Sequence, residues 1–467
     1  MSAQPPFDAA IIGAGPGGYV AAIRASQLGL RAVVIERDSR FGGTCTLRGC
    51  IPTKALLRDA HLLHEVRKAI QQGLFKTGAL DFDFDKIQAR KNDIIGKSNK
   101  GIDYLFRKNK VTVVRGSATI VSPNRISVSG ETISQIEARN IIIATGSEAK
   151  PLPGYTVDEQ RIITNVGALD MTAVPQSLLV VGAGAVGVEF ASIYNAFGTK
   201  VTLLEALPQL VPLEDEEVAK ELRRVFTRKG IDCYTNARLE SAKTTDAGVE
   251  AAFVADNGER KTVTAEKLLM ATGRAPNTAG IGLETVGVAM ERGYIRVDRY
   301  MQTNVPGIYA IGDVVPTPQL AHVAFHEGVV AVERIAGKNP PEINYLHVPN
   351  CTYCDPQIAS VGMTEAKAIA AGHKVKTGKF PFTAVAKARI EDATDGFVKI
   401  VASEADGEIL GVHMIGSGVT ELIGEGVTAM GLEGAVADMA HLIHAHPTLS
   451  ESVHEALEAV FGAAIHI

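Results

Sequence analysis

Two cysteines stand five positions apart in the segment GGTCTLRGCIPTK, residues 42–54, of a 467-residue chain that contains five cysteines in all. Thiols at this spacing could form a disulfide that opens and closes, bind a metal ion, or lie buried without chemistry. A zinc site needs about four ligands, and no second cysteine pair stands near Cys45 and Cys50. Buried thiols stay open as an alternative, although they do not explain the spacing.

The spacing constrains the backbone between the two cysteines. In an ideal helix, positions i and i+5 lie about 7.5 Å apart along the axis, whereas a disulfide needs Cα atoms roughly 4.4–6.8 Å apart. If Cys45 and Cys50 bond, residues 45–49 are therefore expected to be loop-like. Gly43 and Gly49 supply the freedom that such a loop requires.

The residues after Cys50 predict the start of a helix. Pro52 suits a first helical turn, which would place Cys50 near a helix N-terminus. The positive end of the helix dipole stabilises a thiolate there. Lys54 follows Cys50 by four residues, so the two side chains are expected on one helical face.

The elements before the cysteines predict a nucleotide-binding unit. The buried strand FDAAII at 7–12 leads into a glycine turn, then into the helical segment YVAAIRASQLGL and the strand RAVVIE, which ends at Glu36. Gly13 permits the tight turn, Gly15 lets the backbone approach a pyrophosphate, and Gly18 allows close packing of helix and strand. The carboxylate of Glu36 is placed to accept hydrogen bonds from ribose hydroxyls.

The pattern recurs in SLLVVGAGAVGVEFASIYNAFGTKVTLLE, whose glycines are Gly182, Gly184 and Gly187 and whose second strand ends at Glu205. The acid follows the first glycine by 23 residues in both copies. Each copy is later followed by an apolar strand that ends in Ala-Thr-Gly, at 140–146 and 267–274. Two such copies predict two Rossmann-like domains and two cofactors.

The cysteines indicate which cofactor belongs to which copy. A dithiol exchanges electrons readily with a flavin but does not accept hydride directly from nicotinamide, so FAD is assigned to the N-terminal unit and NAD to the second. Glu205 would repel a 2′-phosphate, which favours NAD over NADP. A solvated acid at the end of a strand is the alternative interpretation of Glu205.

The length, at about 150 residues per domain, predicts about three domains. We expect an FAD-binding domain at 1–149, an NAD-binding domain at 150–274, a central segment at 275–345 that returns to the FAD domain, and an α+β dimerisation domain at 346–467. Within them we expect a helical stretch at about 55–108, antiparallel strands through 111–136, a strand ending at Gly312-Asp313, and a hairpin turn at Asp406-Gly407.

Composition excludes several functional classes. The net charge of −5 and the pI of about 6.2 give no basic field that would attract nucleic acid. No apolar run reaches the roughly 18 residues of a membrane helix, and the N-terminus has no basic region typical of a signal peptide. A sparse, odd set of cysteines is not a secreted disulfide framework, so we expect a cytoplasmic protein.

The motif GGTCxxxGCIPxK after a glycine turn resembles the flavoprotein disulfide reductases, and HAHPTLSE at 444–451 resembles their second catalytic motif. The resemblance implies that Cys45 exchanges with substrate while Cys50 lies against the flavin. It also implies a homodimer, in which His446 of the partner subunit is the acid–base and Glu451 orients it. Lys54 and Glu189 are expected to pair near the flavin ring.

Further cofactor-binding residues are predicted along the chain, at Thr44, Gly116, Thr145, Gly146, Ser147, Gly273, Arg274, Gly312, Asp313, Ala321 and His322.

Three features in the C-terminal part of the chain allow other interpretations. Glu451 could serve only as the acid of a T-x-x-E capping box that begins at Thr448. The C-terminal histidines could suggest a metal, but no carboxylate or cysteine framework completes a ligand set, and we predict no metal site. The pair Cys351 and Cys354 lacks a helix start and is predicted to be structural.

Within the family, the stretch LAHVAFHEG at 320–328 resembles the lipoamide dehydrogenase branch, as does the acid at Glu205. This implies oxidation of dihydrolipoamide carried by an acyltransferase or carrier protein of a 2-oxo acid dehydrogenase or glycine-cleavage complex.

Arg48 departs from the family pattern by placing a cation between the cysteines, where it could lower a thiol pKa or contact substrate. A reductase of small disulfides and a redox-silent FAD-binding scaffold stay open as alternatives.

Overall fold

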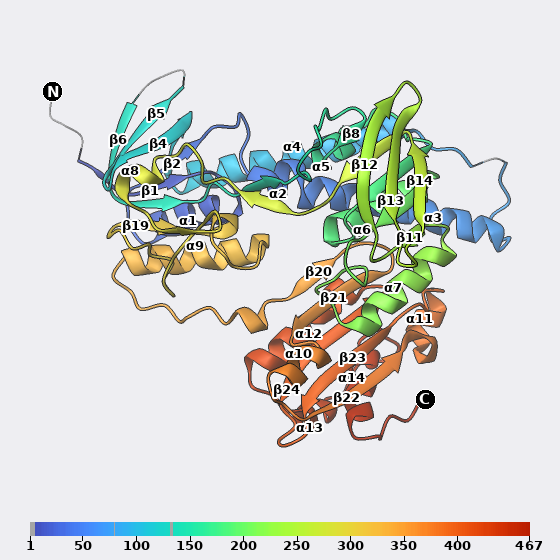
Figure 1. The fold of residues 1–467 in the computed structure, drawn as a ribbon. Coiled ribbons are helices and arrows are strands. Elements are labelled where there is room, and N and C mark those ends of the chain that lie inside the picture. The colour runs from blue at the N-terminus through green and yellow to red at the C-terminus, as the bar shows by residue number, and fades with distance from the viewer. Residues whose placement is uncertain (1–4, 79, 131–133) are drawn as a thin grey trace. The chain divides into compact units, whose positions relative to one another are not determined.

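A computed structural model of the chain describes residues 5–78, 80–130 and 134–467 (Figure 1). The chain forms two compact units. The first comprises residues 1–55, 86–150 and 274–345, and the second comprises residues 56–85, 151–273 and 346–467. The predicted α/β class is confirmed, while the domain boundaries drawn from the sequence stay predictions.

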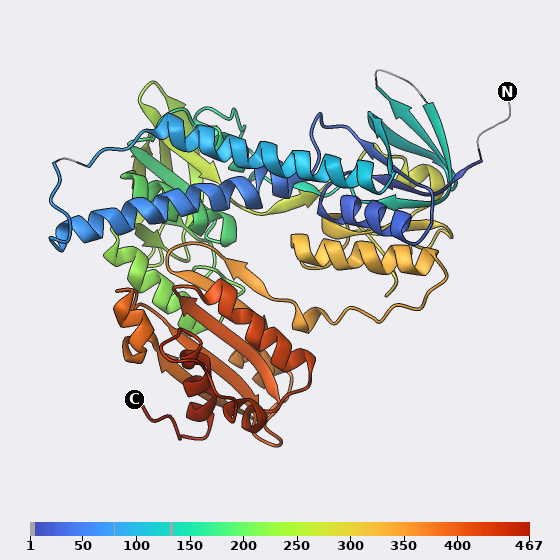
Figure 2. The ribbon, with the colours of Figure 1, turned by 180° about the vertical axis from the view of Figure 1, so that it is seen from behind.

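The first unit is built on a parallel sheet in the order β3-β2-β1-β6, and β19 pairs with β6 on its other side. These strands are β1 (Phe7–Ile12), β2 (Ala32–Glu36), β3 (Thr112–Arg115), β6 (Ser134–Ile143) and β19 (Ile308–Ala310). Helices α1 (Pro16–Gln27) and α9 (Ala321–Ile335) lie side by side against it (Figures 1 and 2). Its central strands are almost wholly buried, as hydrophobic runs in parallel sheets usually are.

The strands through residues 111–136 agree with the prediction only in part. Strands β4 (Ser117–Ser122), β5 (Arg125–Ser129) and the start of β6 pair antiparallel, as expected. Strand β3 instead pairs parallel with β2. Alternating side chains reveal a strand but not its direction, so the sequence could not distinguish the parallel strand β3 from its antiparallel neighbours.

The first unit also contains β7 (Ser147–Ala149), β16 (Arg274–Pro276), α8 (Leu283–Val286), β17 (Met290–Glu291), β18 (Tyr294–Ile295) and η1 (Gly312–Val314).

The stretch predicted to be helical at about 55–108 is two helices, α3 (Cys50–Gln71) and α4 (Phe84–Lys108). Helix α3 begins five residues earlier than expected, at Cys50 itself, and follows the short helix α2 (Gly43–Arg48). Among the described residues, no helix is long and apolar enough to cross a membrane.

The second unit contains another parallel sheet, in the order β11-β10-β9-β15-β8. Its elements are β8 (Ile162–Ile163), α5 (Asn165–Leu169), β9 (Ser177–Val181), α6 (Ala185–Phe197), β10 (Lys200–Leu204), α7 (Glu216–Arg228), β11 (Asp232–Tyr234) and β15 (Lys267–Met270). An antiparallel sheet of β12 (Arg238–Thr245), β13 (Gly248–Val254) and β14 (Arg260–Ala265) packs on it through Phe253 and neighbouring apolar side chains.

The same unit ends in an antiparallel sheet, in the order β20-β21-β24-β23-β22, against which α12 and α14 pack (Figure 2). The hairpin predicted at Asp406-Gly407 is confirmed, since it joins β23 to β24 and Gly407 has a φ of +77°. The elements are η2 (Tyr345–His347), β20 (Asn350–Thr352), β21 (Gln357–Gly362), α10 (Glu365–Ala370), β22 (Val375–Pro381), η3 (Phe382–Ala384), α11 (Ala386–Ile390), β23 (Phe397–Ser403), β24 (Ile409–Gly416), α12 (Val419–Gly431), α13 (Val436–Ala440) and α14 (Glu451–Val460).

Candidate active site

The two glycine turns have the same local structure. Gly13 and Gly182 adopt φ values of +104° and +99°, and a Cβ on either would lie 2.4 Å from the carbonyl oxygen of the residue that directly follows a neighbouring strand, Ala144 or Ala271. A Cβ on Gly18 or Gly187 would lie 1.9 Å from the carbonyl oxygen of the first glycine of its turn. These four positions therefore require glycine because the chain turns and packs too closely for any side chain.

The middle glycines are different, because neither backbone strain nor crowding explains them. Gly15 and Gly184 precede α1 and α6 with ordinary φ values of −70° and −71°. A Cβ on Gly184 would meet no atom within 4 Å, and one on Gly15 would meet only the Cα of Gly43, at 3.8 Å. The space that a Cβ would enter lies at a helix N-terminus, where a pyrophosphate binds in this motif. Both turns therefore fit a dinucleotide.

This difference gives a test in one turn. Gly184→Ala should leave the free energy of unfolding within about 0.5 kcal/mol of wild type, a usual value for an uncrowded site. For NAD, which the sequence assigns to this turn, binding should weaken about tenfold, since overpacking by one methyl costs about 1–3 kcal/mol. Gly182→Ala is the contrasting variant and should lower the unfolding free energy itself. Urea unfolding and NADH titration of both proteins would check this, and equal unfolding losses would contradict it.

The two predicted ribose-binding acids occupy equivalent places. Glu36 accepts hydrogen bonds from the N–H groups of Ala14 at 2.7 Å and Asp38 at 2.8 Å. Glu205 accepts them from the N–H groups of Ala183 at 2.7 Å and Leu207 at 2.9 Å. Each carboxylate is thus fixed beside its own glycine turn, and each oxygen keeps a lone pair that could accept a further hydrogen bond.

The cysteine pair lies at the junction of two helices. Cys45 is on α2, Gly49 ends that helix with φ −145° and ψ −110°, and Cys50 is the first residue of α3. A loop at residues 45–49 was expected for a bonded pair, and it stays a prediction for that state because the structure has two thiols. The chain is helical through Arg48, and the single break at Gly49 brings the two cysteines together.

The structure shows the pair as two half-buried thiols in hydrogen-bonding contact. The hydrogen bond to Cys50 and burial raise the pKa of the Cys45 thiol, while the charge of Lys54 acts to lower it. Cys50 stands at the N-terminus of a 22-residue helix, where the dipole favours negative charge. A single negative charge shared by the pair is therefore better placed on Cys50 than on Cys45.

Arg48 has an acidic partner outside the cysteine pair. Its guanidinium forms an ion pair with Asp38, the residue two positions after Glu36. The cation that acts on Cys45 is Lys54. Arg48 therefore ties α2 to the end of β2.

Several of the predicted cofactor-binding residues of the first unit form a hydrogen-bonded group. Arg274 donates to the Ser147 hydroxyl at 2.7 Å and to its carbonyl at 2.6 Å, and the hydroxyl donates to Asp313. Thr44 donates to the same carbonyl at 3.3 Å.

A second group joins Thr145 to Asn277. The Thr145 hydroxyl donates to the Asn277 carbonyl at 2.7 Å, and the Asn277 side-chain amide donates to the Thr145 carbonyl at 3.1 Å. The Asn277 N–H also donates to the Gly146 carbonyl.

One residue of this region escaped the sequence prediction. Glu327 of α9 is wholly buried, and its carboxylate accepts hydrogen bonds from the Gly312 N–H at 2.6 Å, Thr317 at 2.7 Å and Tyr345 at 3.0 Å. Burial raises the pKa of this carboxyl. Glu327 fixes the turn that presents Asp313, and the only signal for it was the acid of LAHVAFHEG.

The other predicted positions lie as follows. Ala321 and His322 begin α9, and Gly116 donates its N–H to the Glu36 carbonyl at 3.0 Å. Gly273 ends the Ala-Thr-Gly segment that follows β15 and has a φ of +114°. Glu189 of α6 is buried and accepts from the Tyr353 N–H at 2.8 Å. The pairing of Lys54 with Glu189 joins residues of different compact units and stays a prediction.

The C-terminal histidine motif forms an exposed pair. His446 is 70% exposed, and its Nδ1 lies 2.8 Å from Glu451 Oε1, while Oε2 of Glu451 accepts the Thr448 N–H at 2.9 Å. Partial burial raises the pKa of the Glu451 carboxyl, but the hydrogen bonds from Thr448 and His446 outweigh it, so the pKa lies below its usual range. Helix α14 begins at Glu451 with Ser450 as its N-cap, so Thr448 is not the helix cap.

Comparisons with known proteins cover nearly the whole chain. Residues 7–328 match the model of the pyridine nucleotide-disulphide oxidoreductases, and residues 348–457 match the dimerisation domain of the same proteins. The chain belongs to the pyridine nucleotide-disulphide oxidoreductase family. It is 44% identical to a dihydrolipoyl dehydrogenase of Bacillus subtilis, over 98% of this chain and 99% of the relative.

Two further members extend the comparison. A mitochondrial dihydrolipoyl dehydrogenase of Arabidopsis thaliana is 41% identical over 98% of this chain and 91% of its own length. The crystal structure of LpdA from Mycobacterium tuberculosis superposes with a TM-score of 0.88 at 30% identity, covering 96% of this chain and 99% of that one. The similarity to these oxidoreductases therefore includes the residues of both units.

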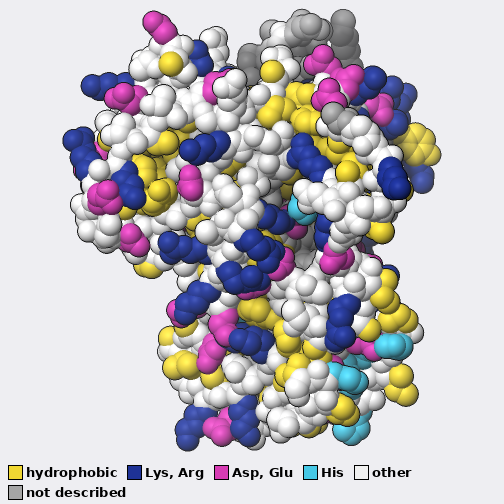
Figure 3. All heavy atoms as spheres, turned by 90° about the vertical axis from the view of Figure 1, so that its right-hand side faces the viewer, with side chains coloured by type: hydrophobic (Ala, Val, Ile, Leu, Met, Phe, Trp, Pro, Cys, Tyr) yellow, Lys and Arg dark blue, Asp and Glu magenta, His cyan; other side chains and the backbone are white. Residues whose placement is uncertain are grey.

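As a family member with a dimerisation domain, the chain forms a homodimer. Exposed apolar side chains stand on both sides of the histidine motif: Ile443 directly before it is 100% exposed, and Phe461 and Ile465 at the chain end are 54% and 82% exposed. Figure 3 shows histidine and hydrophobic side chains adjacent on this C-terminal part. Large apolar side chains that stay exposed in one subunit mark a contact surface.

Two features of the oxidoreductase lie outside these motifs. Cys354 is wholly buried, its thiol donates a hydrogen bond to the Pro356 carbonyl at 3.2 Å, and neither it nor Cys351 forms a disulfide.

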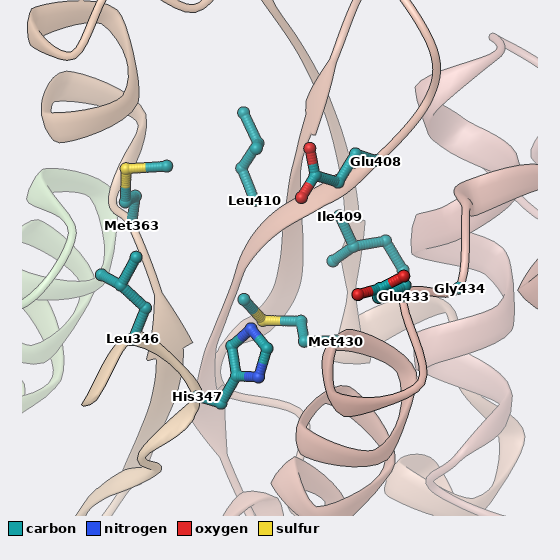
Figure 4. A pocket seen from close by; sticks show the side chains of 9 residues that line it. All are labelled: Leu346, His347, Met363, Glu408, Ile409, Leu410, Met430, Glu433 and Gly434. Atoms are coloured by element: carbon teal, nitrogen blue, oxygen red, sulfur yellow. The ribbon is translucent and has the colours of Figure 1, made fainter. Parts of the chain in front are cut away.

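A pocket in the C-terminal part contains none of the predicted site residues (Figure 4). It is lined by Leu346, His347, Met363, Glu408, Ile409, Leu410, Met430, Glu433 and Gly434. Among the described residues, no cluster of three metal-binding side chains occurs.

Proposed function

We propose that this oxidoreductase catalyses the oxidation of protein-bound dihydrolipoamide to lipoamide with NAD+ as acceptor, the activity of a dihydrolipoyl dehydrogenase. The observation that carries the proposal is the contact of Cys45 with Cys50 at the start of α3, beside the first of two glycine turns. Its relatives at 40–44% identity bear the same name. A redox-silent scaffold would need neither the thiol pair nor an aligned His446–Glu451 pair.

The residues of the chain divide the work as follows. His446 of the partner subunit takes a proton from one thiol of dihydrolipoamide, and Glu451 holds the imidazole by its Nδ1. The substrate thiolate attacks Cys45 of the disulfide, which releases Cys50 as thiolate; the second substrate thiol then displaces Cys45 and lipoamide leaves. The first glycine turn would hold FAD and the second NAD, and a bound flavin would supply the two-electron chemistry that links the Cys45–Cys50 dithiol to the nicotinamide.

The dinucleotide assignment rests on the surroundings of the glycine turns. The uncrowded backbone at Gly15 and Gly184 supports a pyrophosphate at each turn, and the fixed carboxylates of Glu36 and Glu205 support a ribose beside each. Because Cys45 and Cys50 follow the first turn, we assign FAD there and NAD to the second. Cys45 and Cys50, with His446 and Glu451, are the catalytic residues, and the remaining predicted residues bind the two cofactors.

Changing Glu205 tests the choice of NAD over NADP. Glu205→Arg should raise the ratio of kcat/KM for NADP+ to that for NAD+ by at least about tenfold, because a carboxylate facing a phosphate costs several kcal/mol. Steady-state kinetics with both coenzymes would measure the ratio. Glu205→Gln is the matched control, since it keeps an acceptor for the Ala183 N–H and removes only the charge. An unchanged ratio in both variants would contradict the assignment.

The partner follows from the substrate. We propose that the enzyme serves a lipoyl-bearing acyltransferase or carrier protein of a 2-oxo acid dehydrogenase or glycine-cleavage complex. The wild-type homodimer should oxidise a reduced lipoyl domain faster than free dihydrolipoamide at equal concentration, and turnover of neither would overturn the proposed function. Reduction of oxidised glutathione at a higher rate would favour the alternative of a small-disulfide reductase.

A further inference from the structure

The segment between β10 and α7, residues 205–215, borders the second glycine turn. It begins at Glu205, whose carboxylate accepts the Ala183 N–H, and its Val211 donates an N–H to the Ala183 carbonyl at 2.9 Å. Leu210 and Val211 are buried, whereas Leu207 and Leu213 are 52% and 77% exposed. The segment is thus pinned to the turn at two points and leaves apolar side chains open beside it.

Val211 adopts a φ of +42°. Among the described non-glycine residues with positive φ, it is the one with a β-branched side chain, for which this region is a genuine outlier. Such a conformation persists only where the surrounding structure enforces it, and it is found at ligand clamps. The strain raises the question of what holds the segment in place.

The far end of the segment is fastened to the C-terminal sheet. Lys399 of β23 is 2% exposed, and its ammonium lies 3.2 Å from Asp215, 2.9 Å from Glu217 and 2.7 Å from Glu365. Asn350 of β20 donates to Glu214 at 2.6 Å. A buried ammonium with three carboxylate partners holds its neighbours in a defined arrangement, because any displacement leaves a buried charge unpaired.

We propose that Lys399 is a positioning residue for the dinucleotide site. Acting through Asp215, it holds residues 205–215 in the strained conformation that keeps Glu205 and Val211 against the glycine turn. Coenzyme affinity then depends on a residue of the C-terminal sheet that touches no coenzyme. The inference rests on the proposed function in one respect, since it takes NAD as the ligand of this turn.

The test compares Lys399→Met with Lys379→Met in the FAD-loaded homodimer. Lys379 pairs with the same Glu217, at 2.6 Å, but from an exposed position on β22. For Lys399→Met we expect the Kd for NADH to rise roughly tenfold, within the range for residues of one hydrogen-bond network. The KM for dihydrolipoamide and the flavin absorbance should stay unchanged. Lys379→Met should match wild type in all three, and an equal rise in its Kd would overturn the proposal.

A double variant separates positioning from general loosening. Glycine adopts positive φ without strain, so Lys399→Met/Val211→Gly should recover part of the NADH affinity that Lys399→Met loses. Wild-type affinity in folded Lys399→Met, or no recovery in the double variant, would overturn the inference. If Lys399→Met does not fold, Asn350→Ala replaces it and should weaken NADH binding in the same direction; unchanged affinity there would also overturn it. Wild type that binds no NADH would instead refute the proposed function.

Discussion

Replacing Cys50 by serine is expected to reduce dihydrolipoamide oxidation by at least about three orders of magnitude, as does the loss of one member of a catalytic group that acts as a unit. Serine keeps the size of the side chain at the start of α3, so the fold and the flavin content should be retained. Without the Cys50 sulfur no disulfide can form, and substrate thiols have nothing to reduce.

Two measurements distinguish the roles of the cysteines. Anaerobic NADH should produce a long-wavelength absorbance from the Cys50 thiolate beside the flavin in wild type, and none in Cys50→Ser. In Cys45→Ser the band should be present before NADH is added, because Cys50 then lacks a disulfide partner. Cys233→Ser removes a cysteine that lies outside the motif and should behave as wild type. A wild-type band in Cys50→Ser would show that the assigned roles are wrong.

The cysteine junction shows how far the sequence reaches. The pair, its glycines and Pro52 were enough to predict that Cys50 lies at a helix start, which the structure confirms. The sequence did not predict the helix at residues 43–48, because only one continuous helix and a loop for a bonded pair were compared. The chain uses a third solution, in which two helices meet at a sharp turn at Gly49. Helix pattern alone does not reveal where one helix ends and another begins within a few residues.

The glycine turns were predictable because each glycine answers a local constraint within its own strand–turn–helix unit. Glu327 and Arg48 were not, because their roles depend on partners that the fold supplies. Glu327 reaches Thr317 and Tyr345 from within α9, and Arg48 reaches Asp38 at the end of a strand. A charged residue in a sequence is equally compatible with solvent, substrate or an ion pair until its neighbours are known.

His446→Gln is expected to lower the rate of dihydrolipoamide oxidation by about two to four orders of magnitude, the usual contribution of a general acid–base. Glutamine keeps a polar group beside Glu451 but cannot take a proton from the substrate thiol. The thiol pair and the glycine turns are built from other residues, so NADH reduction of the flavin should proceed at the wild-type rate.

The split between these two half-reactions is what identifies His446 as the acid–base. A stopped-flow comparison should show slow reduction by dihydrolipoamide and unchanged reduction by NADH. Glu451→Gln should lose less, because it removes only the carboxylate that orients the imidazole through the 2.8 Å contact. His373→Gln changes a histidine outside the motif and serves as the control. Equal slowing of both half-reactions in His446→Gln would point to a disturbed dimer rather than to lost proton transfer.

Mixing inactive His446→Gln with inactive Cys50→Ser subunits tests the shared site directly. If each site takes His446 from the partner, heterodimers regain one functional site, whereas mixtures without any activity would contradict that arrangement.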